Sequence, residues 1–319
     1  MPPSIYSGAK QSYRINKSLA GDEPPAVKRG TSTGKGMKEK RRRNMANKNM
    51  KKVVLITGAS SGIGKETAKL LSQSGLVVYG AARRLEKMQD LKDAGVHILP
   101  MDVTDEKSMV KGVQDILKAE KRIDVLVNNA GYGSYGSLED VPLSEAKYQF
   151  EVNVFGMARL TQLVIPQMRS QKSGKIINIS SIGGKLGEPH GAWYHATKFA
   201  VEGLSDSIRM ELKQFGIQVI VIEPGAIITE WNRISRENLI KRSGNTAYKT
   251  MAVKQVHMME KADKWGSRPV VIARVIKKAV DSPHPRTRYA AGGGAKPLLF
   301  LRSIVPDKLF DRLYLSQLK

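Results

Sequence analysis

Tyr194 and Lys198 are the two residues whose types and spacing most directly indicate chemistry. Side chains four positions apart on a helix project from the same face, so a phenol and an ammonium lie within reach of one substrate. Reduction of a ketone needs a proton for the developing alkoxide, and a fixed cation beside a tyrosine lowers its pKa from the usual value of about 10. The pair therefore indicates general acid–base catalysis by Tyr194. The same spacing is also common on helices that have no catalytic role.

A glycine-rich turn follows the apolar run Val53–Thr57 and has the composition of a phosphate-binding loop. The chain reads GASSGIG from Gly58, and a helix is expected to begin near Ile63. Helix N-termini carry free N–H groups and a partial positive charge, and glycine lets a pyrophosphate approach the backbone closely. The glycines at Gly58, Gly62 and Gly64 therefore predict a dinucleotide site, although ordinary turns also favour glycine.

Arg83 and Arg84 follow the next apolar run, where a dinucleotide fold usually places an acidic residue that binds the adenosine ribose. Ala82, 18 residues after Gly64, stands near that position, and no acidic residue is found there. Guanidinium groups suit a 2′-phosphate, which an acidic residue would repel. The pattern therefore favours NADP(H) over NAD(H), the alternative being that both arginines are solvated loop residues.

Short β-branched runs alternate with amphipathic stretches from Lys52 onward, which is typical of βαβ units that form a parallel sheet. The expected fold class is α/β, a Rossmann-type doubly wound parallel sheet of about seven strands with helices on both faces. In such a sheet ligands bind beyond the carboxyl ends of the strands, which is where the motifs described above lie. The expected strands are Val53–Thr57, Val77–Ala81, His97–Pro100, Val125–Asn128, Lys175–Ile179, Gln218–Glu223 and Arg288–Ala290.

The charge of the chain is unevenly distributed. The formal net charge is +24, and residues 1–50 hold 12 Lys and Arg against three acidic residues without apolar periodicity. We expect a disordered basic tail at residues 1–50 and one oxidoreductase domain at residues 51–319. The run KEKRRR at Lys38–Arg43 leaves open a nucleic-acid or membrane-surface contact, and translation starting at Met45 or Met50 is a further alternative.

Cysteine is absent from the chain, which excludes disulfides and thiolate metal sites and favours a reducing, cytoplasmic setting. The five histidines show no ligand spacing, so no metal site is expected. No run of about 18 apolar residues predicts a membrane-spanning helix.

Together these motifs resemble the short-chain dehydrogenase/reductase family, of the single-domain, NADP(H)-preferring type, over about residues 51–305. The resemblance implies four catalytic residues, Asn153, Ser181, Tyr194 and Lys198. Ser181 stands thirteen residues before Tyr194, the spacing of the family's catalytic serine, whose hydroxyl donates to the substrate oxygen. Its neighbour Ser180 is expected to face the opposite way. Asn153 corresponds to the residue that holds a proton-relaying water, and Lys198 also binds the nicotinamide ribose.

The resemblance also implies the cofactor contacts. Arg83 corresponds to the main 2′-phosphate contact, Asp102 to the residue that meets the adenine, and Asn129 to the residue that supports the sheet beside the ribose. Thr229, after the break at Pro224 and Gly225, corresponds to a contact with the carboxamide and pyrophosphate. The full expected set is Gly58, Ser60, Ser61, Gly62, Ile63, Gly64, Arg83, Asp102, Val103, Asn129, Tyr194, Lys198, Pro224, Gly225 and Thr229.

The expected function is hydride transfer between NADP(H) and a carbonyl or alcohol substrate; the alternative is an NADP(H)-binding redox sensor with little turnover. Residues 227–269 are expected to form a substrate lid, in which Trp231, Met251, Met258, Met259 and Trp265 indicate an apolar substrate. The segment Tyr289–Leu313 resembles 17β-hydroxysteroid and retinol dehydrogenases, so sterols, retinoids and other carbonyl compounds stay open. The family resemblance further implies a homodimer or homotetramer.

Overall fold

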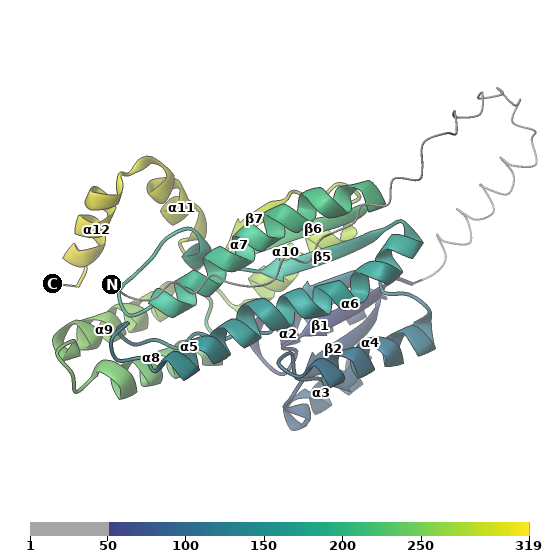
Figure 1. Cartoon of the computed structure of the whole chain (residues 1–319), viewed down its shortest axis with the longest axis horizontal. Helices are drawn as coiled ribbons and strands as arrows, with labels where there is room; N and C mark the ends of the chain where they lie inside the picture. The colour runs from purple at the N-terminus through teal and green to yellow at the C-terminus, as the bar shows by residue number, and fades with distance from the viewer. Residues whose placement is uncertain (1–50, 319) are drawn as a thin grey trace, which may run out of the picture. The chain divides into compact units, whose positions relative to one another are not determined.

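A seven-stranded parallel sheet forms the centre of the part of the chain that the structure describes, residues 51–318 of a computed structural model (Figure 1). Its strand order is β3-β2-β1-β4-β5-β6-β7, and every neighbouring pair is parallel. The expected fold class is confirmed. The expected tail at residues 1–50 lies outside the described residues. The strands are β1 (Val53–Thr57), β2 (Val77–Ala82), β3 (His97–Pro100), β4 (Val125–Asn128), β5 (Gly174–Ile179), β6 (Ile217–Pro224) and β7 (Arg288–Ala291).

Each predicted strand is found within one residue of its expected limits. The central strands are buried on both faces and are therefore continuous apolar runs, which local composition reveals. All five residues of β1 are buried. Val54 and Ile56 pack into one apolar core and Val53 and Leu55 into another, as the alternation of side chains along a strand requires.

Helices cover both faces of the sheet. Helices α2 and α10 pack with one face, and helices α4 and α6 with the other. The α-helices are α2 (Gly62–Gln73), α3 (Gln89–Asp93), α4 (Glu106–Glu120), α5 (Leu143–Phe150), α6 (Gly156–Gln171), α7 (Ala192–Leu212), α8 (Glu230–Ser243), α9 (Lys249–Trp265), α10 (Pro269–Asp281), α11 (Ala295–Ile304) and α12 (Asp307–Ser316). Short 3-10 helices occupy Leu85–Met88, Ile182–Gly184 and Lys213–Phe215.

The order of the strands reverses between β1 and β4, so the loops that follow these two strands diverge at this point of the sheet. These loops carry the glycine-rich turn and Asn129. The topology therefore brings the two motifs together at the carboxyl edge of the sheet.

The region expected to form a lid, residues 227–269, consists mainly of α8 and α9, which pack against each other. Helix α10 begins at Pro269, and its apolar stripe packs on the sheet. Within residues 51–318, no helix combines the length and the apolar composition that crossing a bilayer requires.

Candidate active site

Tyr194 and Lys198 lie one turn apart on α7, and both side chains are buried. The Lys198 Nζ atom lies 5.8 Å from the centroid of the Tyr194 ring and donates a hydrogen bond of 2.9 Å to the carbonyl oxygen of Ile179. Ile179 is the last residue of β5, so this bond ties the lysine to the carboxyl edge of the sheet. The helical spacing thus brings the phenol and the ammonium to one place.

The Ser181 side chain hydrogen-bonds to Tyr194 and accepts a hydrogen bond of 3.0 Å from the Gly183 N–H. The Ser180 Oγ atom is buried and would lie 2.8 Å from a Cβ added at Gly184. Of the two adjacent serines, Ser181 is the one that hydrogen-bonds to the tyrosine.

Burial sets the pKa values of the pair. It raises the pKa of Tyr194 to about 12, and the charge of Glu188 adds to this, while the Ser181 hydrogen bond lowers it. Burial lowers the pKa of Lys198 to about 8, an effect that the nearby charge of Glu202 opposes. The expectation that Lys198 brings the pKa of Tyr194 down is wrong for this arrangement, since burial outweighs any effect of the ammonium.

Two aromatic rings cover Tyr194. The ring of Trp231, on α8, lies with its centroid 5.3 Å from that of Tyr194, and the ring of Tyr135 lies 5.8 Å away. Tyr135 and Trp231 meet edge to face at 5.8 Å. Gly133 lies against the Trp231 ring. A Cβ atom added at this position would come within 2.5 Å of the indole, so only glycine leaves room for the ring. The rings exclude water from the phenol, which explains its raised pKa.

Sequence analysis did not identify Tyr135, although the glycine-flanked tyrosines of the loop after β4 are a recognisable signal. Of the apolar residues expected in the lid, Trp231 and Met259 pack with Tyr194 in one apolar cluster. Met251 and Trp265 are instead 38% and 57% exposed, so they do not belong to that cluster.

Asn153 lies in a single π-helical turn, Glu151–Phe155, between α5 and α6. Its Oδ1 atom accepts from the Tyr132 N–H at 3.0 Å, and its Nδ2 group donates to the Tyr132 carbonyl oxygen at 2.9 Å and to the Thr197 Oγ1 atom at 3.0 Å. Such turns occur frequently at functional sites because they redirect a side chain within a helix. This one joins the loop after β4 to α7 beside Tyr194 and Lys198.

The glycine-rich turn has the backbone of an anion cradle. Gly58 and Gly62 have φ angles of +67° and +55°, which favour glycine, and α2 begins at Gly62. A Cβ at Gly64 would lie 2.4 Å from the Gly58 carbonyl oxygen. The Asn129 Nδ2 group donates to the carbonyl oxygens of Thr57 and Gly58, at 3.0 and 3.3 Å, which holds the two loops together.

The structure places Arg84, rather than Arg83, against the serines of this turn. The Arg84 Nη2 group donates to the Ser60 and Ser61 Oγ atoms at 3.2 and 3.4 Å. Arg83 is 61% exposed, donates to the Tyr148 hydroxyl at 2.9 Å and lies 3.8 Å from an Asp102 carboxylate oxygen. Both guanidinium groups thus lie at the end of β2, and Arg84 is the one that reaches the serines of the turn.

Glu230, the first residue of α8, pairs with Arg84 and Lys87, which together with Arg83 form a basic cluster at the end of β2. Its Oε1 and Oε2 atoms lie 3.0 Å from the Lys87 Nζ atom and 3.4 Å from an Arg84 guanidinium nitrogen. Trp231 follows it in the chain, so the residue that covers Tyr194 is adjacent to one that binds the basic cluster.

The remaining predicted contacts line the same edge of the sheet. The Asp102 Oδ1 atom accepts from the N–H and the hydroxyl of Thr104, at 2.9 and 2.8 Å. Thr229 is the N-cap residue of α8 and lies against Gly62, where an added Cβ atom would come within 3.2 Å of the Thr229 Cγ2 atom. A Cβ at Gly225, after Pro224, would lie 2.2 Å from a backbone oxygen. Ile63 packs on the core, and the Val103 backbone approaches α6.

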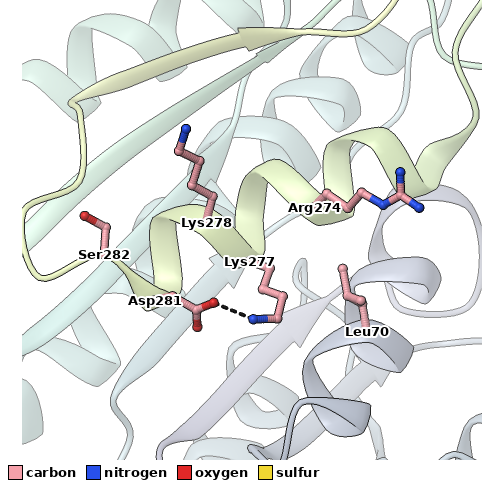
Figure 2. Close-up of a pocket in the computed structure, with 6 residues that line it drawn as sticks. All are labelled: Leu70, Arg274, Lys277, Lys278, Asp281 and Ser282. Atoms are coloured by element: carbon pink, nitrogen blue, oxygen red, sulfur yellow. Dashed lines mark hydrogen bonds and ion pairs between the residues drawn. The ribbon is translucent and has the colours of Figure 1, made fainter.

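A pocket away from Tyr194 and the glycine-rich turn lies between α2 and α10, where Lys277 pairs with Asp281 (Figure 2). Its lining contains none of the residues that surround Tyr194 or the glycine-rich turn. The residues that line it are Leu70, Arg274, Lys277, Lys278, Asp281 and Ser282.

Residues 52–239 match the family described as short chain dehydrogenase. The chain belongs to this family. Among family members, it is 38% identical over 261 residues to a 3-ketodihydrosphingosine reductase of Bacteroides thetaiotaomicron, a match that covers 81% of this chain and 95% of that protein. It is 33% identical over 282 residues to an NADPH-dependent 3-dehydrocapnine reductase of Ornithobacterium rhinotracheale, covering 83% and 96% of the two chains.

A solved short-chain dehydrogenase from Streptomyces avermitilis has the same fold, with a TM-score of 0.70 and 35% identity over 83% of this chain and 95% of that one. The family's fold binds NAD or NADP, so the protein is an oxidoreductase of a nicotinamide-dependent family. The glycine-rich turn fits such a cofactor, since α2 begins at Gly62 and its N-cap residue Ser61 makes no side-chain cap hydrogen bond, which leaves N–H groups of the helix terminus for a phosphate.

Proposed function

We propose that this short-chain dehydrogenase interconverts a carbonyl group and an alcohol on an apolar substrate with NADP(H), using Tyr194 as the general acid/base. The observation that carries the proposal is the Tyr194 hydroxyl, which is hydrogen-bonded to Ser181 and lies one helical turn from Lys198. Intact catalytic residues favour turnover over the alternative of a redox sensor.

Each residue has a role that follows from its contacts. The α2 N-terminus and its glycines would hold the pyrophosphate of NADP(H), which would supply or accept the hydride when bound. Tyr194 passes its hydroxyl proton to the substrate oxygen, and Ser181 donates a hydrogen bond to that oxygen. The family resemblance assigns Lys198 to the nicotinamide ribose, and its hydrogen bond to the Ile179 carbonyl oxygen would hold it at that edge of the sheet. Asn153 holds Thr197, the neighbour of Lys198 on α7, and its predicted role in a water relay stays a prediction.

Burial favours the proton-donating form of Tyr194. It raises the pKa of the phenol to about 12, so Tyr194 is protonated at neutral pH and can donate a proton to a carbonyl oxygen. Oxidation of an alcohol would need the phenolate instead.

The basic cluster at the end of β2 supports NADP(H) as the cofactor. Arg84 and Lys87 form one part of it, and Arg83 stands beside them. Guanidinium groups bind phosphate by paired, charge-assisted hydrogen bonds. The NADPH dependence in the name of the Ornithobacterium relative supports the same choice.

Two relatives support a substrate with a ketone on a long apolar chain, since their names assign them 3-ketodihydrosphingosine and 3-dehydrocapnine. The apolar residues around Trp231 suit such a chain. The resemblance of Tyr289–Leu313 to 17β-hydroxysteroid and retinol dehydrogenases keeps sterols and retinoids among the candidates. We further propose a cytoplasmic homodimer or homotetramer, in which the exposed rings of Phe155 and Phe199 become buried.

The test is a spectrophotometric assay of NADPH oxidation with a panel of long-chain, sterol and retinoid carbonyl compounds. We expect Tyr194→Phe to lower kcat/KM by at least about 100-fold, the lower end of what a positioned acid contributes. Tyr248→Phe is the matched control, since this hydroxyl donates to Glu139 at 2.8 Å on the surface, away from Tyr194. Full turnover by Tyr194→Phe refutes the mechanism, and equal use of NADH refutes the cofactor choice.

A further inference from the structure

The last two helices of the domain, α11 and α12, carry exposed apolar side chains and lie at one end of the domain (Figure 1). Phe300 and Ile304 are one turn apart on α11 and are 65% and 62% exposed. Leu309 and Leu313 have the same spacing on α12 and are exposed as well. Side chains four positions apart lie on one helical face, so each helix presents an apolar stripe to the outside.

Other faces of the same two helices already pack on the domain. Phe310 of α12 and Leu318 just after this helix are buried, and the Tyr314 hydroxyl between them donates to the Glu188 Oε2 atom at 2.7 Å. Helix α11 contacts β7 and the short helix Ile182–Gly184. The two exposed stripes are therefore additional to the side chains that hold α11 and α12 in place, and contiguous exposed apolar surface of this kind marks an interaction site.

Exposed apolar side chains are concentrated in residues 227–319. Of the 18 large hydrophobic residues that are exposed within residues 51–318, 12 follow position 227. One of them, Trp265, lies next to the start of α11, where a Cβ atom added at Gly294 would come within 3.1 Å of the indole. Indole rings are enriched at the boundary between water and a bilayer, so this tryptophan suits the same kind of partner as the stripes.

The positive charge of the domain is concentrated in the same part of the chain. Residues 227–319 hold 19 Lys and Arg against seven Asp and Glu, whereas residues 51–226 hold 22 against 19. Lys296 of α11 and Lys308 and Arg312 of α12 are exposed and alternate with the apolar stripes in the sequence. A surface that combines exposed apolar side chains with positive charge is complementary to a bilayer that contains anionic lipids.

We propose that the outer faces of α11 and α12 dock on a bilayer that contains anionic lipids. The apolar stripes enter the headgroup region, and the basic side chains meet the lipid phosphates. A second copy of the chain is a poorer partner, because a symmetric contact places two surfaces of the same positive sign against each other. Nucleic acid would use the positive charge but would leave the aliphatic side chains exposed.

Docking in this way would place the bilayer close to the candidate active site. Helix α11 contacts Ile182–Gly184, the segment that directly follows Ser181. Helix α12 is bonded through Tyr314 to Glu188, in the loop that leads to α7 and Tyr194. A substrate with an apolar chain, as proposed above, would therefore have a short path from the bilayer to the tyrosine.

The test is sedimentation of the full-length protein with vesicles of phosphatidylcholine and phosphatidylserine, and with vesicles of phosphatidylcholine alone. We expect binding to the mixed vesicles that weakens as salt is added, because salt screens the attraction between basic side chains and anionic lipids. Phe300→Ser/Ile304→Ser is expected to weaken this binding at least about tenfold, since two apolar side chains no longer enter the bilayer. Met210→Ser is the matched control: this side chain is 69% exposed on α7, and its loss is expected to leave the binding unchanged.

A second pair of variants separates this surface from the basic residues 1–50, which all the variants retain. Lys308→Gln/Arg312→Gln is expected to weaken vesicle binding about fivefold for each charge removed. Lys107→Gln/Lys118→Gln removes the same charge from α4, and screening by salt limits its expected effect to less than about twofold.

Three results would overturn the proposal. The first is vesicle binding of wild-type strength by Phe300→Ser/Ile304→Ser, and the second is an equal loss of binding in the two charge variants. The third is a change of oligomeric state in Phe300→Ser/Ile304→Ser, measured by light scattering without vesicles, because it would identify the surface as a contact between copies of the chain. None of these measurements requires turnover, so they are independent of the proposed function.

Discussion

Replacing Trp231 by alanine removes the indole that covers Tyr194, and we expect it to lower the pKa of the phenol. Burial is the largest of the causes that raise this pKa from 10.0 to about 12. At about 1.4 kcal/mol per pH unit, the shift amounts to roughly 3 kcal/mol of preference for the neutral phenol. Water that reaches the ring in Trp231→Ala solvates the phenolate and removes much of that preference.

The assay is the pH dependence of kcat/KM for NADP⁺-dependent oxidation of an alcohol, which reports the pKa of the free enzyme's base. We expect the rising limb of the profile to lie about one to two pH units lower in Trp231→Ala than in the wild type. The Ser181 hydrogen bond lowers the pKa in both forms, so it does not account for the difference.

Trp265→Ala is the control, because this indole is 57% exposed and is not among the rings that pack on Tyr194. It removes the same side chain and is expected to leave the profile in place. Circular dichroism verifies that both variants are folded. A profile of Trp231→Ala that coincides with the wild type refutes the argument that burial under the indole sets the pKa.

Three further outcomes follow from the site. Burial lowers the pKa of Lys198 to about 8, so its ammonium form is present below that pH. The rate of NADPH-dependent reduction is therefore expected to decline as the pH rises through 8, and a flat rate profile between pH 6 and 10 contradicts this. Asn153→Ala removes three hydrogen bonds to Tyr132 and Thr197, so we expect it to lower the free energy of unfolding, measured in urea, by roughly 2–4 kcal/mol. A loss below about 1 kcal/mol would show that these three bonds do not stabilise the fold. Glu230→Gln removes the carboxylate that pairs with Arg84 and Lys87, which leaves both cations for the 2′-phosphate. We therefore expect the KM for NADPH to fall about 2- to 10-fold, and an equal change in the KM for NADH shows that the 2′-phosphate is not involved.

The sequence by itself determined the order and the limits of the strands, because a parallel strand buried on both faces is a continuous apolar run that local composition reveals. It also determined that Tyr194 and Lys198 share a helical face and that a helix begins within one residue of Ile63. These features depend on residues a few positions apart, so they can be predicted without knowledge of the tertiary structure.

Only the tertiary structure decided which arginine meets the serines of the glycine-rich turn, since Arg83 and Arg84 are equivalent in the sequence and differ in their distant neighbours. It also decided the pKa of Tyr194, because burial is produced by Tyr135 and Trp231, which lie far from it in the chain. The placement of Glu188 against α9 and α12 joins segments more than 60 residues apart. Desolvation and long-range contacts depend on how the whole chain packs, and no local pattern encodes them.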